Sequence, residues 1–329
     1  MNNQTTTVYP WLQKSWNQLR RYQQQNRLPS AIMLVGAKGL GLSEFAKIFA
    51  HSVFCLNKNN DGMACGSCSS CLLVQAGNYP DLFHVQPEED KKSISIDAIR
   101  KLSASLALNN QFTTPRIVII DSADVMLHQA SNSLLKTLEE PSENTSLILI
   151  AHKLSRVPMT IRSRCQILSI KDINSQQTSS WLKAAGCVEA EEYLDLAGEL
   201  PLLALDMWQM EALEKRNALR KDFVNLLDGK LDPLFFANQC KSLQEFPVLK
   251  WMASWLSDVV KCLHEANNIQ SLVPNIDDGL KVVTKKLHLK QITDLLARLA
   301  TVTDIESSQI NQLLMLEEFS IHCYSLTTK

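Results

Sequence analysis

The sequence contains no long apolar segment, no excess of charge of either sign, and no repeat or low-complexity linker. All of its hydrophobic runs fall short of the roughly 18 residues that a membrane-spanning helix requires. The first seven residues, MNNQTTT, are polar and lack the apolar core of a secretory signal peptide. We therefore expect a cytoplasmic protein that does not contact a membrane.

The charges of the chain nearly cancel, with 33 Lys and Arg against 34 Asp and Glu and a formal net charge of −1. This balance argues against a protein that binds nucleic acid through bulk electrostatics alone. It leaves room for a local basic face or for a role inside a larger DNA-binding assembly. The 329 residues are 45% hydrophobic and 20% charged, which is ordinary for a globular protein of two or three domains.

Apolar runs alternate with amphipathic helical patterns in the first half of the chain. The expected strands are residues 31–35, 81–85, 116–121, 146–150 and 166–168, and the expected helices are 11–26, 42–55, 95–108 and a segment around 130–139. Alternating strands and helices imply parallel strands joined by right-handed crossovers, so we predict an α/β domain.

Strand signals stop after about residue 172, and the remainder of the chain has a helical pattern. Short helices are expected at 175–185 and 188–197, followed by helices that continue to residue 325 with breaks near Gly229, Pro247 and Pro274. The predicted domains are therefore an α/β domain at 1–171, a small all-α domain at 172–212 and a larger all-α domain at 213–329.

A glycine-rich segment, GAKGLGLS at residues 36–43, joins the first predicted strand to the next helix. A strand, a glycine loop and a helix in this order form a phosphate-binding loop with the pattern G-x-x-x-x-G-K-[ST]. Gly36, Gly41 and Ser43 match this pattern, but Leu42 occupies the position of the lysine that contacts the β- and γ-phosphates. The sequence thus predicts the frame of a nucleotide site without its main cation.

The second half of such a site is an acidic pair after a buried strand. Asp121 follows the run RIVII and matches the acid that holds Mg²⁺, whereas Ser122 stands where a glutamate would activate the attacking water. Because Leu42 and Ser122 replace both the cation and the base, we expect nucleotide-site ancestry without ATP hydrolysis.

Four of the nine cysteines cluster with the spacing C-x9-C-x2-C-x2-C, at Cys55, Cys65, Cys68 and Cys71. A C-x2-C step lets one turn present two thiolates to one ion, and four thiolates complete the tetrahedron that Zn²⁺ prefers. Such coordination leaves no open position for a substrate. We therefore predict a structural zinc module at residues 55–71, with four buried free cysteines as the alternative.

These segments together resemble the clamp-loader branch of the AAA+ ATPases. The resemblance rests on the degenerate loop 36–43, the cysteine insertion after its helix, GNYPD at 77–81, LLKTLEEP at 134–141 and Ser163-Arg164-Cys165. It covers the first domain densely and the helical half only by length and pattern. It implies a RecA-like AAA+ domain with a zinc insertion, a helical lid and a helical collar that oligomerises in a ring.

The resemblance also implies a function and a set of partners. Ser163, Arg164 and Cys165 match the family motif that offers an arginine finger to a neighbouring subunit, so Arg164 is the expected finger. The implied partners are ATPase subunits of the gamma or tau type and a delta subunit in the DNA polymerase III assembly, a nucleotidyltransferase complex. Through that assembly the chain would act on the sliding clamp and primed DNA during replication.

Three hypotheses of different classes remain at this point. The first is a clamp-loader subunit that does not hydrolyse ATP itself and acts through Arg164. The second is an active ATPase motor of the same family, which Leu42 and Ser122 argue against. The third is a zinc-dependent DNA-binding module, which would show tight, salt-sensitive affinity for DNA in isolation.

Overall fold

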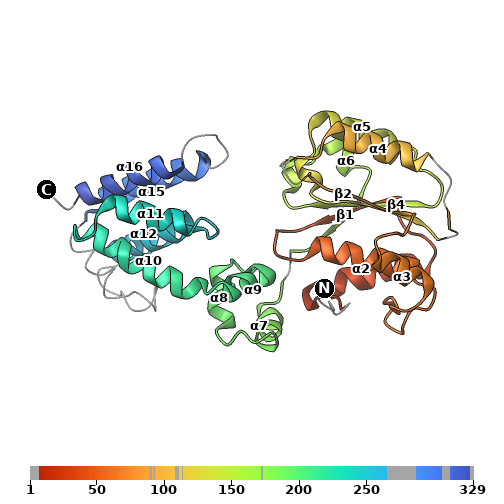
Figure 1. The fold of residues 1–329 in the computed structure, drawn as a ribbon, viewed down its shortest axis with the longest axis horizontal. Coiled ribbons are helices and arrows are strands. Elements are labelled where there is room, and N and C mark those ends of the chain that lie inside the picture. The colour runs from red at the N-terminus through yellow and green to blue at the C-terminus, as the bar shows by residue number, and fades with distance from the viewer. Residues whose placement is uncertain are drawn as a thin grey trace. The chain divides into compact units, whose positions relative to one another are not determined.

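The fold is described by a computed structural model that covers residues 7–88, 91, 93–107, 111–112, 114–171, 173–264, 287–305 and 312–326. The chain forms two compact units, residues 1–206 and 207–329 (Figure 1). Within the described ranges, no helix has both the length and the apolar character needed to cross a membrane. The division into three domains at residues 172 and 213 remains a prediction.

The first unit contains a five-stranded, wholly parallel sheet with the order β2-β3-β4-β1-β5. The strands are β1 Ala31–Val35, β2 Leu82–Val85, β3 Arg116–Ile120, β4 Thr145–Ala151 and β5 Gln166–Ser169. All five predicted strands and the α/β class are confirmed. The three central strands, β1, β3 and β4, are buried along their whole length, which explains their continuous apolar runs.

Helices cover both faces of this sheet (Figure 1). Helices α1 Gln13–Gln24 and α2 Leu42–Phe54 pack on one face, and α4 Ile96–Leu106, α5 His128–Glu139 and α6 Met159–Arg162 pack on the other. Successive residues of β1 point to opposite faces. Accordingly, Ile32 and Leu34 belong to the core beneath α1 and α2, while Met33 and Val35 belong to the core beneath α4 and α5.

The remaining helices follow the predicted pattern. Shorter elements of the first unit are η1 Pro10–Leu12, α3 Ser69–Gln75, η2 Ala123–Val125, η3 Leu154–Arg156, α7 Ser175–Ala184 and α8 Ala190–Leu196, and α9 Pro201–Gln209 leads into the second unit. The second unit contains α10 Ala212–Leu227, α11 Pro233–Ser242, α12 Val248–His264, α15 Leu289–Ile305 and α16 Gln312–Ser325. The predicted breaks at Gly229 and Pro247 fall between helices, and the break at Pro274 lies outside the described residues.

A buried ion pair secures the edge of the sheet where β2 and β3 begin. Asp81 and Arg116 are 1% and 2% exposed, and Arg116 Nε lies 3.4 Å from Asp81 Oδ1. Asp81 Oδ2 also accepts hydrogen bonds from the backbone N–H groups of Gln111 and Phe112, at 3.1 and 3.0 Å. Arg116 Nη1 donates to the carbonyl of Leu106 at 3.0 Å. The aspartate of the GNYPD segment is therefore a structural anchor.

Removing one partner of this pair leaves the other charge buried without compensation. We expect Asp81→Ala to lower the free energy of unfolding by about 3–5 kcal/mol. Glu88→Ala removes an exposed ion pair with Lys91 and should cost no more than about 1 kcal/mol. Urea unfolding of both variants followed by circular dichroism measures the difference, and equal losses would contradict the anchoring role.

Candidate functional site

The glycine loop at 36–43 keeps the backbone conformation of a tight strand-to-helix turn. The N–H of Gly36 donates to the carbonyl of Ala151 at 3.2 Å, which holds the loop against the end of β4. Gly39 and Gly41 have φ angles of +90° and +75°, which other residues rarely adopt. A Cβ atom on Gly41 would lie 2.6 Å from the Tyr9 ring, so this glycine is required by both conformation and space.

Leu42, at the lysine position of the motif, is directed into the protein core. Its side chain is 2% exposed and belongs with Leu40 to the apolar cluster beneath α1 and α2. The indole Nε1 of Trp11 donates to the carbonyl of Leu40 at 2.9 Å, which fixes the loop from the N-terminal side. The position that would reach toward phosphates is thus used for packing.

Apolar residues from two other segments cover the loop. A Cβ atom on Gly39 would meet the Cβ atoms of Leu203 and Leu200 at 3.2 and 3.3 Å, and the N–H of Leu202 donates to the Gly39 carbonyl at 3.1 Å. The start of α9 therefore lies directly against the loop. Leu200, Leu202 and Leu203 thus pack closely against Gly39 and Gly41.

An aromatic cluster extends this cover. The rings of Tyr9 and Trp11 stack at 4.9 Å, and Trp181 of α7 meets both edge-on at 5.6 and 5.1 Å. Sequence reasoning missed this cluster because it assigned Trp11 to the face of a helix. The available signal was the presence of two aromatic residues, Tyr9 and Trp11, in the segment that precedes α1. Their partner Trp181 lies about 170 residues further along the chain.

The strand-end acid and the loop serine lie side by side, as expected for a nucleotide site. Ser43 Oγ donates to Asp121 Oδ2 at 2.5 Å, and His84 Nε2 lies 3.9 Å from the same oxygen. Burial opposes the charge of Asp121, but hydrogen bonds from His84 and Ser43 and the nearby charges of His84 and His152 bring its pKa below the ordinary value. The next residue, Ser122, stands at the position of the expected glutamate and has a left-handed backbone with φ of +64°.

Hydrogen bonds fix the segment that follows β4. The backbone N–H groups of His152 and Lys153 donate to the two carboxylate oxygens of Asp124, at 3.1 and 3.2 Å. His152 Nδ1 lies 3.1 Å from the carbonyl of Gly36, and because a carbonyl only accepts, Nδ1 must carry the proton. His152 is thus bonded to the glycine loop itself.

Arg164 lies on the surface directly after α6. Its Nη1 donates to the Thr160 carbonyl at 2.9 Å, and its Nη2 forms an ion pair with Glu139 Oε1 at 2.6 Å. The side chains are 36% and 50% exposed, respectively. Ser163 Oγ donates to the Thr160 carbonyl at 3.2 Å, and burial raises the pKa of Cys165 to about 11. Only the arginine of this motif presents a charge.

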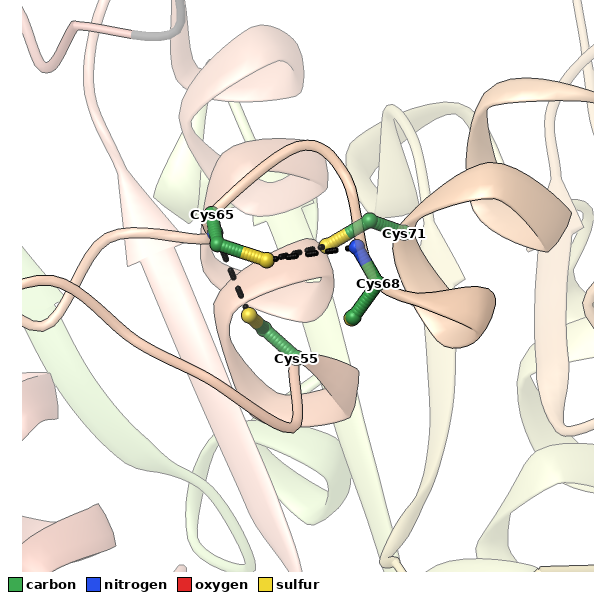
Figure 2. A group of neighbouring side chains, drawn as sticks. All are labelled: Cys55, Cys65, Cys68 and Cys71. Atoms are coloured by element: carbon green, nitrogen blue, oxygen red, sulfur yellow. Dashed lines mark hydrogen bonds between the residues drawn. The ribbon is translucent and has the colours of Figure 1, made fainter.

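The four clustered cysteines converge on one point (Figure 2). Their sulfur atoms all lie within 4.8 Å of one another, and Cys65 Sγ is 3.9 Å from Cys71 Sγ. Sulfurs bound to one tetrahedral zinc ion at about 2.3 Å would lie roughly 3.8 Å apart. The cluster can therefore hold a metal ion, and its donors fit zinc.

Backbone hydrogen bonds favour the thiolate form of Cys65. The N–H of Cys65 donates to Cys55 Sγ at 3.2 Å, and that of Cys68 donates to Cys65 Sγ at 3.4 Å. Backbone donors at Ser67 and Cys68 lower the pKa of Cys65 to about 6, whereas burial raises the pKa of Cys71. A divalent cation would supply the charge that the buried thiolates require.

The loop of the cysteine module is fastened to α1. Trp16 Nε1 donates to the Asp61 carbonyl at 3.2 Å, and Arg20 Nη2 donates to the Asn60 carbonyl at 2.5 Å. A Cβ atom on Gly62 would lie 2.9 Å from the Arg20 side chain. The module is therefore an integral part of the layer that α1 and α2 form.

Known proteins match both units of the chain. Residues 11–174 match the family described as "DNA polymerase III, delta subunit", and residues 210–322 match "DNA polymerase III, delta subunit, C terminal". The "DNA polymerase III subunit delta'" of Pseudomonas aeruginosa is 32% identical over 258 residues, which cover 77% of each chain. The protein of the same name from Haemophilus influenzae is 32% identical over 263 residues, or 78% of each chain.

Among solved structures, a DNA polymerase III gamma subunit-related protein from Thermotoga maritima superposes with a TM-score of 0.49 at 17% identity. The superposition covers 94% of this chain and 99% of that one. The assignment rests on the two sequence relatives, whose similarity extends over more than three quarters of their own length. The chain therefore belongs to the DNA polymerase III delta-prime family of clamp-loader subunits.

Proposed function

We propose that this chain is the clamp-loader subunit that does not hydrolyse ATP and that supplies Arg164 to the ATP site of a neighbouring ATPase subunit. In this role it helps to place the ring-shaped sliding clamp on primed DNA during replication. Its partners would be gamma- or tau-type ATPase subunits and a delta subunit in a hetero-oligomeric ring. The single observation that carries the proposal is the burial of Leu42, at the lysine position of the motif, in the apolar core beneath α1 and α2.

The surroundings of the loop support the proposed absence of hydrolysis. ATP hydrolysis needs a cation on the β- and γ-phosphates and a group that activates water. Leu42 and Ser122 supply neither, and the approach to Gly39 is occupied by Leu200 and Leu203. The remaining acid, Asp121, is hydrogen-bonded by Ser43. In this role the loop is a packing element inherited from a nucleotide-binding ancestor.

The trans role of Arg164 is supported by its exposure and by its present partner. An exposed ion pair such as the one with Glu139 contributes only about 0–1 kcal/mol, so a phosphate from another subunit can replace the carboxylate at little cost. The planar guanidinium suits phosphate oxygens, with which it forms two parallel hydrogen bonds.

We also propose that the bound metal is zinc and that its role is structural. All four donors come from residues 55–71, and full thiolate coordination leaves no open position for a reaction. When bound, zinc would tie the end of α2 to the start of α3. Through Asp61 and Asn60 it would also hold α1 in place. Cytoplasmic localisation remains a prediction from the sequence.

An experiment on the isolated chain tests the absence of hydrolysis. We expect no ATP turnover by the purified wild-type protein. Leu42→Lys should not restore turnover, because the new ammonium would enter an apolar core and the loop would stay covered. The same variant should unfold at a lower denaturant concentration than the matched control Lys38→Ala, which changes an exposed loop residue. Turnover by the wild-type chain that Ser43→Ala abolishes would instead establish the active-motor alternative.

A further inference from the structure

The N-terminal segment has a charge composition unlike the rest of the chain. Residues 1–43 contain five cations and no Asp or Glu, whereas the other 286 residues contain 28 cations and 34 acids. At the average frequency of the chain, a segment of this length would hold about four acids. The net charge of −1 therefore conceals a basic segment, and most of its cations lie on or beside α1.

Helix α1 presents these cations on its solvent side. Its buried side packs Trp16 and Leu19 into the core. The exposed positions recur at helical spacing, and they are Gln13, Lys14, Asn17, Arg21, Gln24 and Gln25, with Asn26 and Arg27 following the helix. We call this set the α1 face. Every exposed residue in it is a cation or a side-chain amide.

The cations of the α1 face have no acidic partners among the described residues. The ion pairs in the described part of the chain join other residues. Lys14, Arg21 and Arg27 take part in none of them. On a helix, a surface cation adds stability when an acid lies three or four positions away. These three cations have no such acids on α1, so their charge remains available to an external anion.

The loop of the cysteine module continues the α1 face. Its residues 57–60, with the sequence NKNN, are all exposed, and Arg20 joins them to α1 through the Asn60 carbonyl. Lys58 lines the same 690 Å³ cavity as Gln23 and Asn26. The acids beside this surface are Asp61, whose carbonyl accepts from Trp16, and Glu143, which also lines the cavity. The combined surface remains cationic.

We propose that the α1 face binds the phosphate backbone of DNA without reading its sequence. Lys14 and Arg21 are seven residues apart, or about 10.5 Å along a helix axis. One DNA strand carries about three phosphates over that distance. Lysine, arginine, asparagine and glutamine side chains are the usual donors to phosphate oxygens. The face therefore has the spacing and the chemistry of a backbone contact.

This contact deepens the role proposed above, since it gives the subunit a DNA-binding surface of its own. It is independent of Arg164. Helix α1 covers the face of the sheet that α2 covers, whereas α6, which precedes Arg164, packs on the opposite face. One surface can hold DNA while the other meets a neighbouring subunit. Three to five contacts predict weak, strongly salt-dependent binding by the isolated chain.

The test uses the full chain, without ATP, and fluorescently labelled 30-base-pair duplex and 30-nucleotide single-stranded DNA. The variant is K14Q/R21Q/R27Q, whose glutamines preserve helix propensity. The control is K221Q/K241Q/K250Q, which removes the same charge from exposed lysines of the second unit. Fluorescence anisotropy at several salt concentrations gives the affinity and its salt dependence for each protein.

We expect the α1 variant to bind at least about tenfold more weakly at low salt, with the slope of log affinity against log salt reduced by about 2.7. The control should retain most of the wild-type affinity and slope. The two DNA forms distinguish contact with a duplex from contact with one strand. Equal weakening by both variants, or no binding by the wild-type chain, would overturn the proposal. So would an α1 variant that binds DNA normally but no longer assembles with the other subunits, since the face would then contact protein.

Discussion

Cys68→Ser should remove the metal from the protein and loosen the whole layer formed by α1, α2 and α3. Apparent binding energies of structural zinc are on the order of 10 kcal/mol, and this energy contributes directly to folding. Loss of one thiolate opens the coordination sphere. The loop then loses its hold on Trp16 and Arg20, which contact the carbonyls of Asp61 and Asn60. We expect loss of most bound zinc and a decrease of several kcal/mol in the free energy of unfolding.

Cys68 is the informative position because it is only partly buried. A serine there costs little packing, so the loss of stability reports the metal. Cys165→Ser makes the same chemical change at a partly buried cysteine outside the cluster and should cost about 1 kcal/mol or less. Metal analysis by mass spectrometry and urea unfolding with and without a chelator provide the measurements.

The chelator adds an internal check on this prediction. It should destabilise the wild-type protein and the Cys165→Ser control, and it should have no further effect on Cys68→Ser. Full metal retention by Cys68→Ser would show that three thiolates suffice or that the ligands lie elsewhere. A wild-type protein that contains no metal and ignores the chelator would leave four free cysteines as the correct interpretation.

The sheet was predictable because each strand carries a local signature. Residues 31–35, 117–120 and 147–151 are continuous apolar runs, as strands buried on both faces require. The cysteine cluster was also readable, since its ligands lie within 17 residues and their spacing constrains the geometry. In both cases the physical cause of the structure is contained in a short segment.

The cover over the glycine loop was not predictable in the same way. It combines Tyr9 and Trp11 with Trp181 and with leucines at the start of α9, which follow them by about 170 and about 190 residues. No local pattern specifies such a contact. The buried pair of Asp81 and Arg116 shows the same limit, because each residue taken alone resembles a surface charge. The sequence predicts that Leu42 cannot supply a cation to a phosphate, but only the structure shows which side chains pack against the loop.

The sequence also left the role of His152 and the environment of Asp121 open. The hydrogen bond between His152 and the Gly36 carbonyl indicates a structural role for this histidine. His84 beside Asp121 was not anticipated, because it lies within β2 and the parallel pairing of β2 with β3 brings the two together. The pairing register of two adjacent strands determines which of their side chains become neighbours.

Arg164→Ala should reduce ATP hydrolysis by the reconstituted clamp loader while leaving the isolated chain intact. An arginine finger contributes roughly 10³–10⁵ in rate at the site that it serves. If Arg164 completes one of several ATP sites, hydrolysis at that site should nearly cease. The total rate of hydrolysis should then fall by the fraction that this site contributes. In the isolated chain the variant loses only the exposed pair with Glu139, at a cost of about 1 kcal/mol or less.

Three further variants separate a finger from a surface cation. Arg164→Lys keeps the charge but not the planar fork, and should restore little activity. Glu139→Gln removes the present partner of Arg164 and should leave hydrolysis unchanged or slightly faster, because the guanidinium is then free to reach a phosphate. Arg156→Ala removes an exposed arginine near the same helix and should have no effect. Single-turnover hydrolysis by complexes of equal subunit content gives the rates. Full activity with Arg164→Ala would contradict the finger role. The neighbouring ATP site would then obtain its cation from another residue.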